Sequence, residues 1–342
     1  MATIMLKEKL NNKESFEALR EKAEAIAADR QDFMVTNVPA NMWMCDDGTL
    51  SFNTTTSSGV QTMNLPTTSW ALAQLSTKLG MPANYSEKCI NAGHPSLAAD
   101  NVNTWLADQQ PGKRKKSVDY MVRQYKDGID AIVTRNYTTF DSPAILNTID
   151  GALNIKDWQP VGSYISDERL HVRLIQDKLL DVEDEDLFPG ICIDSSDVGR
   201  TAFNVTFFIW KRVCTNGMCI SKVGGKLYHQ RHMGITPMEV HRELCSNLQM
   251  IPTLIKRSED IIKASRTKMV DVKDEHAFQK LLADIRRQAA MSEEEAKAVI
   301  QLAQEKYDMS LWGIGNAMTL KAQDYELDRR IVIENAAGKI IA

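Results

Sequence analysis

Apolar residues recur at helical spacing in several stretches of the first half of the chain. Residues 5–30 predict one amphipathic helix, because Phe16, Leu19, Ala23 and Ile26 recur every three or four positions among many charged residues. The same periodicity predicts further helices over residues 70–79, 85–91, 96–107 and 143–153.

Other stretches alternate apolar and polar residues with a period of two, which is typical of strands. Two short apolar runs flank Asp46-Asp47-Gly48 and predict a hairpin. Residues 120–125 and 130–137 alternate on either side of Lys126-Asp127-Gly128 and predict a second strand pair. From Trp158 the chain becomes richer in strand patterns, and strands are predicted over 169–175, 191–195 and 202–214.

From Thr236 onward the pattern is helical again. Thr236-Pro237-Met238-Glu239 has the spacing of a capping box with proline at the first helical position, and Ser292 begins a second helix in the same way. Pro252 predicts a kink within the apolar stripe that follows Thr236. Together these patterns predict an α+β fold, with an antiparallel sheet over about 160–224 packed by helices and a helical C-terminal third.

The order of the patterns predicts three parts of the chain. These are an N-terminal helix over 1–30, a mixed α/β part over 31–155, and a sheet with helices over 158–335. A length of 342 residues suits two domains or one large one, and we expect the second and third parts to pack together.

Composition narrows the class of protein. No run of apolar residues approaches the 18 that a membrane span needs, so we expect no membrane partner. The first ten residues lead straight into charged helical sequence without the apolar segment of a signal peptide. The 6 cysteines form no disulfide framework. We therefore expect a cytoplasmic protein.

Charge is segregated along the chain more sharply than the net charge of −4 indicates. Residues 141–199 carry 4 basic and 13 acidic side chains, a net charge of −9, whereas residues 200–268 carry 12 basic and 4 acidic ones, a net charge of +8. The two blocks either pair with each other in the fold or leave a basic surface for a partner.

Motifs for catalysis and metal binding are weak. The sequence holds no phosphate loop, dinucleotide fingerprint, nucleophile elbow or metalloprotease motif, so no catalytic residue and no cofactor are predicted and a protein without enzymatic activity is favoured. The best metal candidate combines Cys214 and Cys219 with His229 and His232, but the spacing departs from common zinc sites. Because Asn216-Gly217 favours a two-residue hairpin tip, the simpler interpretation makes Cys214 and Cys219 a cross-strand pair, and no metal is expected.

The strand predicted over 202–214 has two different faces. Phe203, Val205 and Phe207 belong to the face that is predicted to lie in the core. The opposite face interleaves aromatic and basic groups, which can stack on exposed bases and contact phosphates, or else lie beneath a helix from the C-terminal half. The predicted nucleic-acid-binding residues on this face and beside it are Arg200, Lys211, Arg212, Lys222, Lys226, Arg231, Phe208 and Trp210.

Five short segments carry a resemblance to a known family. They are residues 79–85 (LGMPANY), 134–137 (TRNY), 194–199 (DSSDVG), 211–217 (KRVCTNG) and 231–234 (RHMG). Within about residues 60–330 they resemble the phage/plasmid-like protein family, a domain of unknown function. The resemblance implies a mobile element of bacteria or their viruses as the source, and it supplies no catalytic residues.

Three functional hypotheses follow. The basic block and the implied mobile-element origin favour a protein that binds single-stranded DNA or RNA as a homo-oligomer. A sheet followed by a long basic helix is also the layout of Rad52-like strand-annealing proteins of recombination, so annealing is one form of this hypothesis. The second hypothesis is an interaction protein that binds a host factor through the acidic surface of residues 141–199. The third, a metal-dependent enzyme, requires Asp194 and Asp197 to meet His171.

Overall fold

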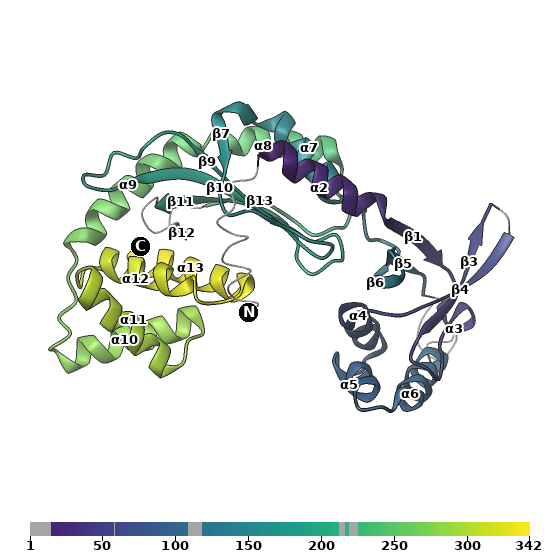
Figure 1. Cartoon of the computed structure of the whole chain (residues 1–342). Helices are drawn as coiled ribbons and strands as arrows, with labels where there is room; N and C mark the ends of the chain where they lie inside the picture. Colours follow the sequence, from purple (N-terminus) through teal and green to yellow (C-terminus); the bar gives the residue numbers. More distant parts are fainter. Residues whose placement is uncertain (1–14, 58, 109–117, 212–215, 219–224) are drawn as a thin grey trace.

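The computed structural model describes residues 15–57, 59–108, 118–211, 216–218 and 225–342, and it divides into two lobes (Figure 1). The smaller lobe contains strands β1 to β6 and helices α3 to α6. The larger lobe contains the remaining strands, helices α7 to α13 and also α2, which precedes the smaller lobe in the sequence. In the described part of the chain, no helix combines the length and the apolar character that crossing a membrane requires.

The smaller lobe is built from two three-stranded antiparallel sheets with the orders β1-β5-β6 and β2-β3-β4. Its core includes the fully buried Val35, Phe52 and Leu75. Helix α4 begins after Thr68, whose side chain accepts a hydrogen bond from the Ala71 amide, and it ends at Gly80 with a left-handed φ of 80°. The elements are β1 (Arg30–Val35), α3 (Val38–Asn41), β2 (Met42–Met44), β3 (Leu50–Thr56), β4 (Gly59–Leu65), α4 (Ser69–Leu79), α5 (Tyr85–Asn91), α6 (Pro95–Asp108), β5 (Tyr120–Tyr125) and β6 (Gly128–Thr134).

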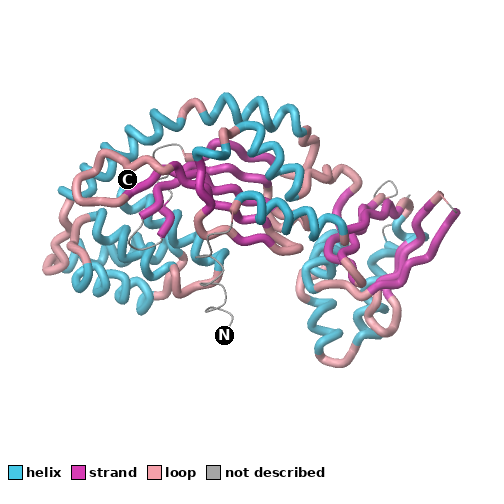
Figure 2. Tube along the Cα trace, turned by 45° about the horizontal axis from the view of Figure 1, so that its top comes forward, coloured by secondary structure: helices cyan, strands magenta, loops and turns pink. Residues whose placement is uncertain are grey.

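An antiparallel sheet forms the centre of the larger lobe, with the order β12-β11-β10-β9-β7. Strand β13 pairs with β11 beside β12, and the short β8 pairs with β9. Figure 2 shows these strands side by side, with helices on either side of them. The strands are β7 (Trp158–Pro160), β8 (Tyr164–Ile165), β9 (Leu170–Gln176), β10 (Leu187–Ser195), β11 (Phe203–Lys211), β12 (Asn216–Met218) and β13 (Lys226–Gln230).

Helices cover both faces of this larger sheet (Figure 1). One face, which carries Val172, Ile193 and Val205, packs in the main hydrophobic core with α2, α7 and α8. Helix α13 lies against the other face, where it shares a cavity wall with Phe208. The helices are α2 (Phe16–Ala28), α7 (Ser142–Ala152), α8 (Pro237–Leu248), α9 (Ile251–Thr267), α10 (Glu275–Ala289), α11 (Glu293–Lys306), α12 (Leu311–Ala322) and α13 (Leu327–Ile341), and a short 3-10 turn lies at Ile155–Asp157.

The structure confirms the predicted α+β class and the helical C-terminal third. The hydroxyl of Thr236 caps α8, and Ser292 forms a complete capping box with Glu295 at the start of α11. Pro252 was predicted to kink one helix, but it lies in the first turn of α9, so the chain forms two separate helices there. A proline is tolerated at that position because its missing amide hydrogen would have no partner within the helix.

The predicted hairpin tip at Asn216-Gly217 is wrong. Both residues lie in β12, where Asn216 pairs with Lys211 and Gly217 pairs with Trp210. Asn216 and Gly217 are thus strand residues, because their pairing with β11 overrides the tip preference of an Asn-Gly pair. Cys214 and Cys219 lie outside the described residues.

The residues of the two hydrophobic cores do not separate along the sequence at the predicted boundaries, 30 and 155. Phe140 and the apolar residues of α7 belong to the core of the larger lobe, although the sequence assigned them to the mixed part over 31–155. Helix α2 also packs into that core through Phe16, Leu19 and Ala23. A chain segment that crosses from one lobe to the other and back shows no local change of pattern, because both lobes use the same helix and strand periods.

Gly190 in β10 offers a test of how closely the larger sheet packs. A Cβ atom at this position would lie 2.6 Å from the Phe208 ring and 2.7 Å from the carbonyl oxygen of Leu174. We predict that Gly190→Ala lowers the free energy of unfolding by about 1–3 kcal/mol, because the backbone oxygen cannot move aside without shifting β9. The measurement is urea unfolding at neutral pH.

The matched control is Gly151→Ala in α7, where the nearest atom to an added Cβ lies 3.5 Å away. This variant is expected to keep or slightly raise the stability, because alanine favours the helix over glycine by about 1 kcal/mol. Equal unfolding free energies for the two variants would contradict the close approach of Phe208 to β10.

Candidate functional site

A buried arginine lies between the two lobes. Arg123, in the middle of β5, is 1% exposed and donates hydrogen bonds to carboxylates from both lobes. Its Nε lies 2.7 Å from Asp32 on the neighbouring strand β1, and its Nη2 lies 2.6 Å from Asp141, which precedes α7. It also donates to the main-chain oxygen of Asp197, after β10. A guanidinium can satisfy five donors in one plane, so Arg123 holds segments from both lobes at once.

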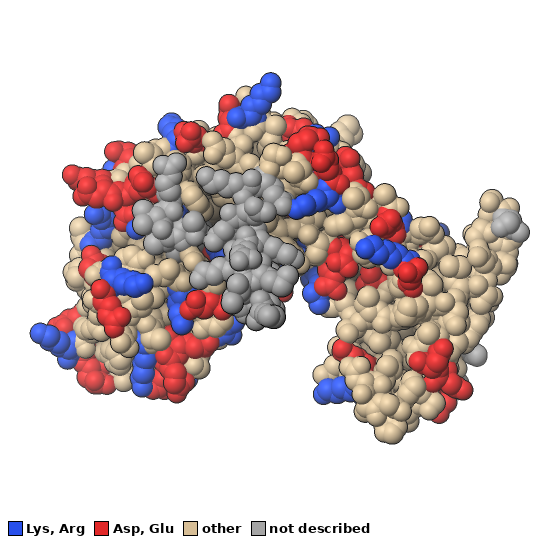
Figure 3. Space-filling model, viewed as in Figure 1, with Lys and Arg blue, Asp and Glu red and all other residues tan. Residues whose placement is uncertain are grey.

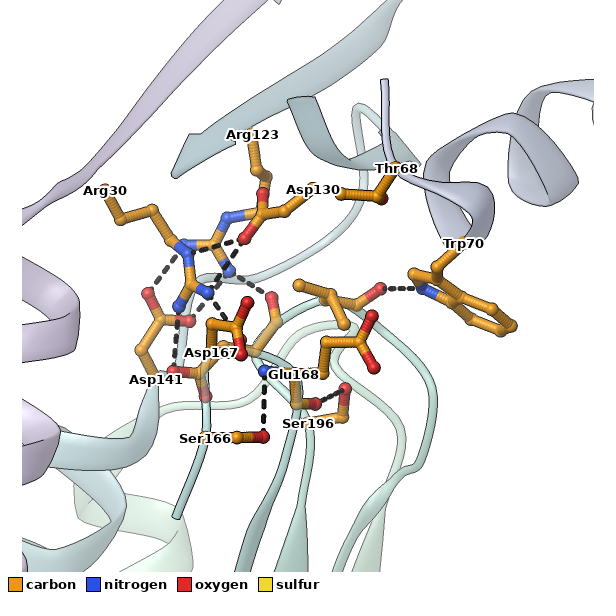
Figure 4. Close-up of polar contacts among 12 residues, drawn as sticks. Arg30, Thr68, Trp70, Arg123, Asp130, Asp141, Ser166, Asp167, Glu168 and Ser196 are labelled. Carbon is orange, nitrogen blue, oxygen red and sulfur yellow. Dashed lines mark hydrogen bonds and ion pairs between the residues drawn. The ribbon is translucent and has the colours of Figure 1, made fainter. Parts of the chain in front are cut away.

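A second arginine, whose side chain is 3% exposed, extends this cluster (Figure 4). Arg30, at the start of β1, donates to Asp130 at 2.9 Å, to the Asp197 carboxylate at 3.0 Å and to the main-chain oxygen of Asp167 at 2.6 Å. We call Arg30, Arg123 and their four carboxylate partners the interlobe network; these partners are Asp32, Asp130, Asp141 and Asp197. Because two cations face four carboxylates, the network favours the uptake of a proton.

Asp197 is the carboxyl group of the network with the most perturbed acidity. One of its oxygens accepts hydrogen bonds from the Ser142 amide at 3.0 Å and the Ser142 hydroxyl at 2.9 Å, at the start of α7. Burial, together with the neighbouring charge of Asp141, raises the pKa of Asp197 to about 6, although Arg30 and Ser142 act in the opposite direction. This carboxyl group therefore titrates close to neutral pH.

Next to the network, both lobes line a cavity of about 360 Å³, which we call the interlobe cavity. Lys78 comes from α4 in the smaller lobe, whereas Arg200 and Arg231 come from loops of the larger lobe. Among the described residues that line the cavity there is no carboxylate. Burial lowers the pKa of Lys78, and an anion in the cavity would counteract this effect. The cavity therefore has the electrostatic character of an anion site.

The loop after β10 carries Arg200 into this position. Its Val198 carbonyl accepts hydrogen bonds from the Trp70 ring nitrogen at 2.9 Å and from the Gln74 side chain at 2.8 Å, both on α4 (Figure 4 draws the Trp70 contact). The Arg200 guanidinium lies over the Trp70 ring at 4.9 Å and also contacts Glu168 at 2.7 Å. A loop of one lobe is thus fastened to a helix of the other.

One buried polar atom at the interlobe cavity, the hydroxyl of Thr201, has no hydrogen-bond partner within the described residues. Nε2 of His232 lies 3.1 Å from the Ser195 hydroxyl. Burial lowers the pKa of His232, whereas its hydrogen bond to the main chain of Thr138 raises it. A buried donor without a partner is costly, and a bound anion would satisfy the Thr201 hydroxyl.

Of the eight predicted nucleic-acid-binding residues, Arg200 and Arg231 meet in the interlobe cavity. Lys226 is exposed on β13 and does not line it. Arg212 and Lys222 lie outside the described residues. Lys211 does not form part of a free basic surface, because it contacts Glu185 at 2.6 Å.

The predicted aromatic platform is wrong for Phe208, which is 3% exposed. Phe208 packs with Phe188 in a small cluster on the face that α13 covers, and the guanidinium of Arg173 lies 5.6 Å from its ring. Trp210 is partly buried at the edge of that cluster. The alternative role of this face, burial beneath a C-terminal helix, therefore applies to Phe208.

The acidic and basic blocks pair with each other at several places. Besides the pairs of Lys211 with Glu185 and Arg200 with Glu168, Lys263 contacts Asp181 at 3.0 Å. On the face shown in Figure 3, basic and acidic side chains are interspersed, and the described residues form no continuous basic surface there. Part of the charge segregation along the sequence is thus used to join neighbouring segments of the fold.

Sequence reasoning missed the contribution of the smaller lobe to this site. Lys78 is an ordinary basic residue in the last turn of α4, where it favours the helix end, so its spacing gave no indication of a cavity. His232 entered the sequence analysis as a metal candidate, but it hydrogen-bonds Ser195, while His229 hydrogen-bonds Asn204. Of the residues that the third hypothesis requires to meet, Asp194 lies 2.7 Å from His171, whereas Asp197 belongs to the interlobe network. The hypothesis of a metal-dependent enzyme stays a prediction.

Comparisons with protein families, with curated proteins and with solved structures find no match for this chain. The resemblance to the phage/plasmid-like family therefore stays a prediction.

The raised pKa of Asp197 makes a prediction about stability. Because the folded protein holds this proton more tightly than the unfolded chain, the stabilising contribution is present at low pH and is lost as the pH rises from about 4 through about 6. We predict that Asp197→Asn, which cannot ionise, becomes about 2 kcal/mol more stable relative to the wild type between pH 4.5 and pH 7.5. The measurement is urea unfolding of both proteins across this pH range.

Asp324→Asn is the control, since Asp324 is an exposed partner of Lys321 on the surface. Its stability relative to the wild type is expected to stay nearly constant over the same range. A difference between Asp197→Asn and the wild type that is constant, or that changes in the opposite direction, would show that Asp197 is ionised throughout.

Proposed function

We propose that this protein binds single-stranded nucleic acid and holds a backbone phosphate in the interlobe cavity. The observation that carries the proposal is the convergence of Lys78, Arg200 and Arg231 on a cavity whose described lining holds no carboxylate. Phosphate contacts from lysine and arginine supply most of the affinity in sequence-independent binding. The unpartnered hydroxyl of Thr201 adds hydrogen-bonding capacity for a phosphate oxygen.

Size and shape favour a single strand over a duplex. The cavity, at about 360 Å³, lies at the lower end of the range for small-molecule sites and has room for a phosphate with part of its sugar. A flexible single strand can bend to place one phosphate between two lobes. A duplex is stiff over about 150 base pairs and carries its phosphates on a convex surface, so it fits such a cavity poorly.

Base stacking contributes little in this proposal. Tyr137 lines the cavity, but its ring stacks on His232 at 5.2 Å and the Arg123 guanidinium lies 5.6 Å from its centre. Phe208 is also buried, and Trp210 is half-buried with its ring 5.9 Å from that of Phe188. We therefore expect binding with strong salt dependence and weak dependence on base sequence.

The test is a titration of a fluorescent single-stranded oligonucleotide at several salt concentrations. Log affinity falls as log salt concentration rises, and we predict that Arg231→Ala makes this fall less steep. The magnitude of the slope should decrease by about 0.7, the value for one lost phosphate contact on a single strand. Adding Arg200→Ala is expected to lower it further but by less, because Arg200 also pairs with Glu168. Each variant is first checked for the wild-type circular dichroism spectrum.

Two control variants separate this proposal from a general effect of charge. Lys211→Ala is expected to leave the slope unchanged, because Lys211 does not line the interlobe cavity and pairs with Glu185. Arg287→Ala removes an exposed arginine from α10, distant in sequence from the cavity lining, and is also expected to have no effect. If Arg231→Ala binds like the wild type, or if Lys211→Ala changes the slope as much, the interlobe cavity is not the nucleic-acid site.

A further inference from the structure

Strands β9 and β10 bring three potential metal ligands together on the sheet face that α13 covers. His171 pairs directly with Asp194 across the two strands, and Cys192 lies two residues before Asp194, so its side chain is on the same face. Nδ1 of His171 lies 2.7 Å from Oδ1 of Asp194. Sγ of Cys192 lies 3.8 Å from that Nδ1 and 3.4 Å from Oδ2 of Asp194.

These separations are close to the edges of a tetrahedral zinc site. Zinc bonds of about 2.0–2.3 Å at tetrahedral angles place neighbouring nitrogen, oxygen and sulfur ligands about 3.4–3.6 Å apart. The two separations that involve Cys192 match this range to within a few tenths of an ångström. Only the contact between His171 and Asp194 must lengthen, and it would do so when a metal ion replaces the shared proton.

The cluster borders a cavity with room for a fourth ligand. Cys192 and Asp194 line a cavity of about 280 Å³, together with Arg169, Arg173 and Glu334 from α13. Three protein ligands and one open position are the arrangement of zinc sites in which water or a small ligand completes the coordination. This cavity is distinct from the interlobe cavity, although Thr201 borders both.

The neighbouring charges permit a cation here. Arg169 contacts Asp194 at 3.2 Å and also pairs with Asp328, and Arg173 pairs with Glu334, so each arginine is matched by a carboxylate. Arg173 lies directly opposite Cys192 across the two strands. Burial lowers the pKa of His171 and favours the neutral imidazole, which is the form that binds a metal ion.

We propose that His171, Cys192 and Asp194 bind one zinc ion, with the fourth coordination position open to the adjoining cavity. The described residues contain no other group of three such donors. The proposal is independent of nucleic-acid binding. It differs from the zinc candidate of the sequence analysis, which rests on Cys214 and Cys219.

The experiment titrates the full chain, freed of metal by a chelator, with zinc in competition with a chromophoric chelator, and separately with cobalt(II). The wild type is expected to bind one ion per chain and to show the sulfur-to-cobalt charge-transfer band of a thiolate ligand. Cys192→Ser is expected to lose that band and to bind zinc more than tenfold more weakly. Asp194→Asn should weaken zinc binding while keeping the band, which shows that the site is still folded.

Two cysteine controls make the test specific. Cys245 on α8 lies 3.5 Å from His241, and the part of the chain that the structure describes places no third ligand beside them, so Cys245→Ser should bind both ions like the wild type. The double variant Cys214→Ser/Cys219→Ser should also keep the site. Absence of stoichiometric zinc, or binding that survives Cys192→Ser and is lost in the double variant, would overturn the proposal.

Discussion

The side chain of Arg123 is buried where the two lobes meet, and the arrangement of the molecule depends on how its charge is satisfied. Removing a guanidinium from water is costly unless each donor finds a partner, and those partners come from β1, from the start of α7 and from the loop after β10. Because these segments belong to different lobes, satisfying Arg123 also sets the position of one lobe against the other. Arg30, on the neighbouring strand β1, likewise pairs with one carboxylate from each lobe, Asp130 and Asp197.

The interlobe cavity follows from this constraint. Asp197 receives Arg30 and Ser142, and the next residues of the same loop are fastened to α4 through the Val198 carbonyl. Arg200 is therefore delivered to the cavity beside Lys78. Asp194, three residues before Asp197, belongs to a different cluster with His171 on the sheet face beneath α13. The end of β10 and the loop after it thus contribute residues to both proposed sites, the zinc site and the interlobe cavity. Among the residues that the structure describes, the two cavities have no carboxylate in common.

Local patterns predicted the parts of this fold that local physics determines. Helix caps such as Thr236 and Ser292, and the alternation that buries Phe203 and Val205, were readable because their partners lie within a few residues or on one face. Of the residues that line the interlobe cavity, only Arg200 and Arg231 were predicted from the sequence to bind nucleic acid. Lys211 was wrongly predicted as part of a basic surface, because only the folded sheet brings its partner Glu185 next to it. The partners of Arg123 lie up to 91 residues away in the sequence, and no periodic pattern can reveal contacts over that distance.

Small-angle X-ray scattering of the full chain at neutral pH tests most directly whether the interlobe network positions the lobes. The wild-type curve is expected to fit one arrangement of the lobes, that of Figure 1. Arg123→Met should increase the radius of gyration while circular dichroism shows intact helices. Arg135→Met, which removes an exposed side chain that pairs with Asp119, should leave the curve unchanged. A wild-type curve that requires several lobe separations, or an Arg123→Met curve identical to it, would contradict this account.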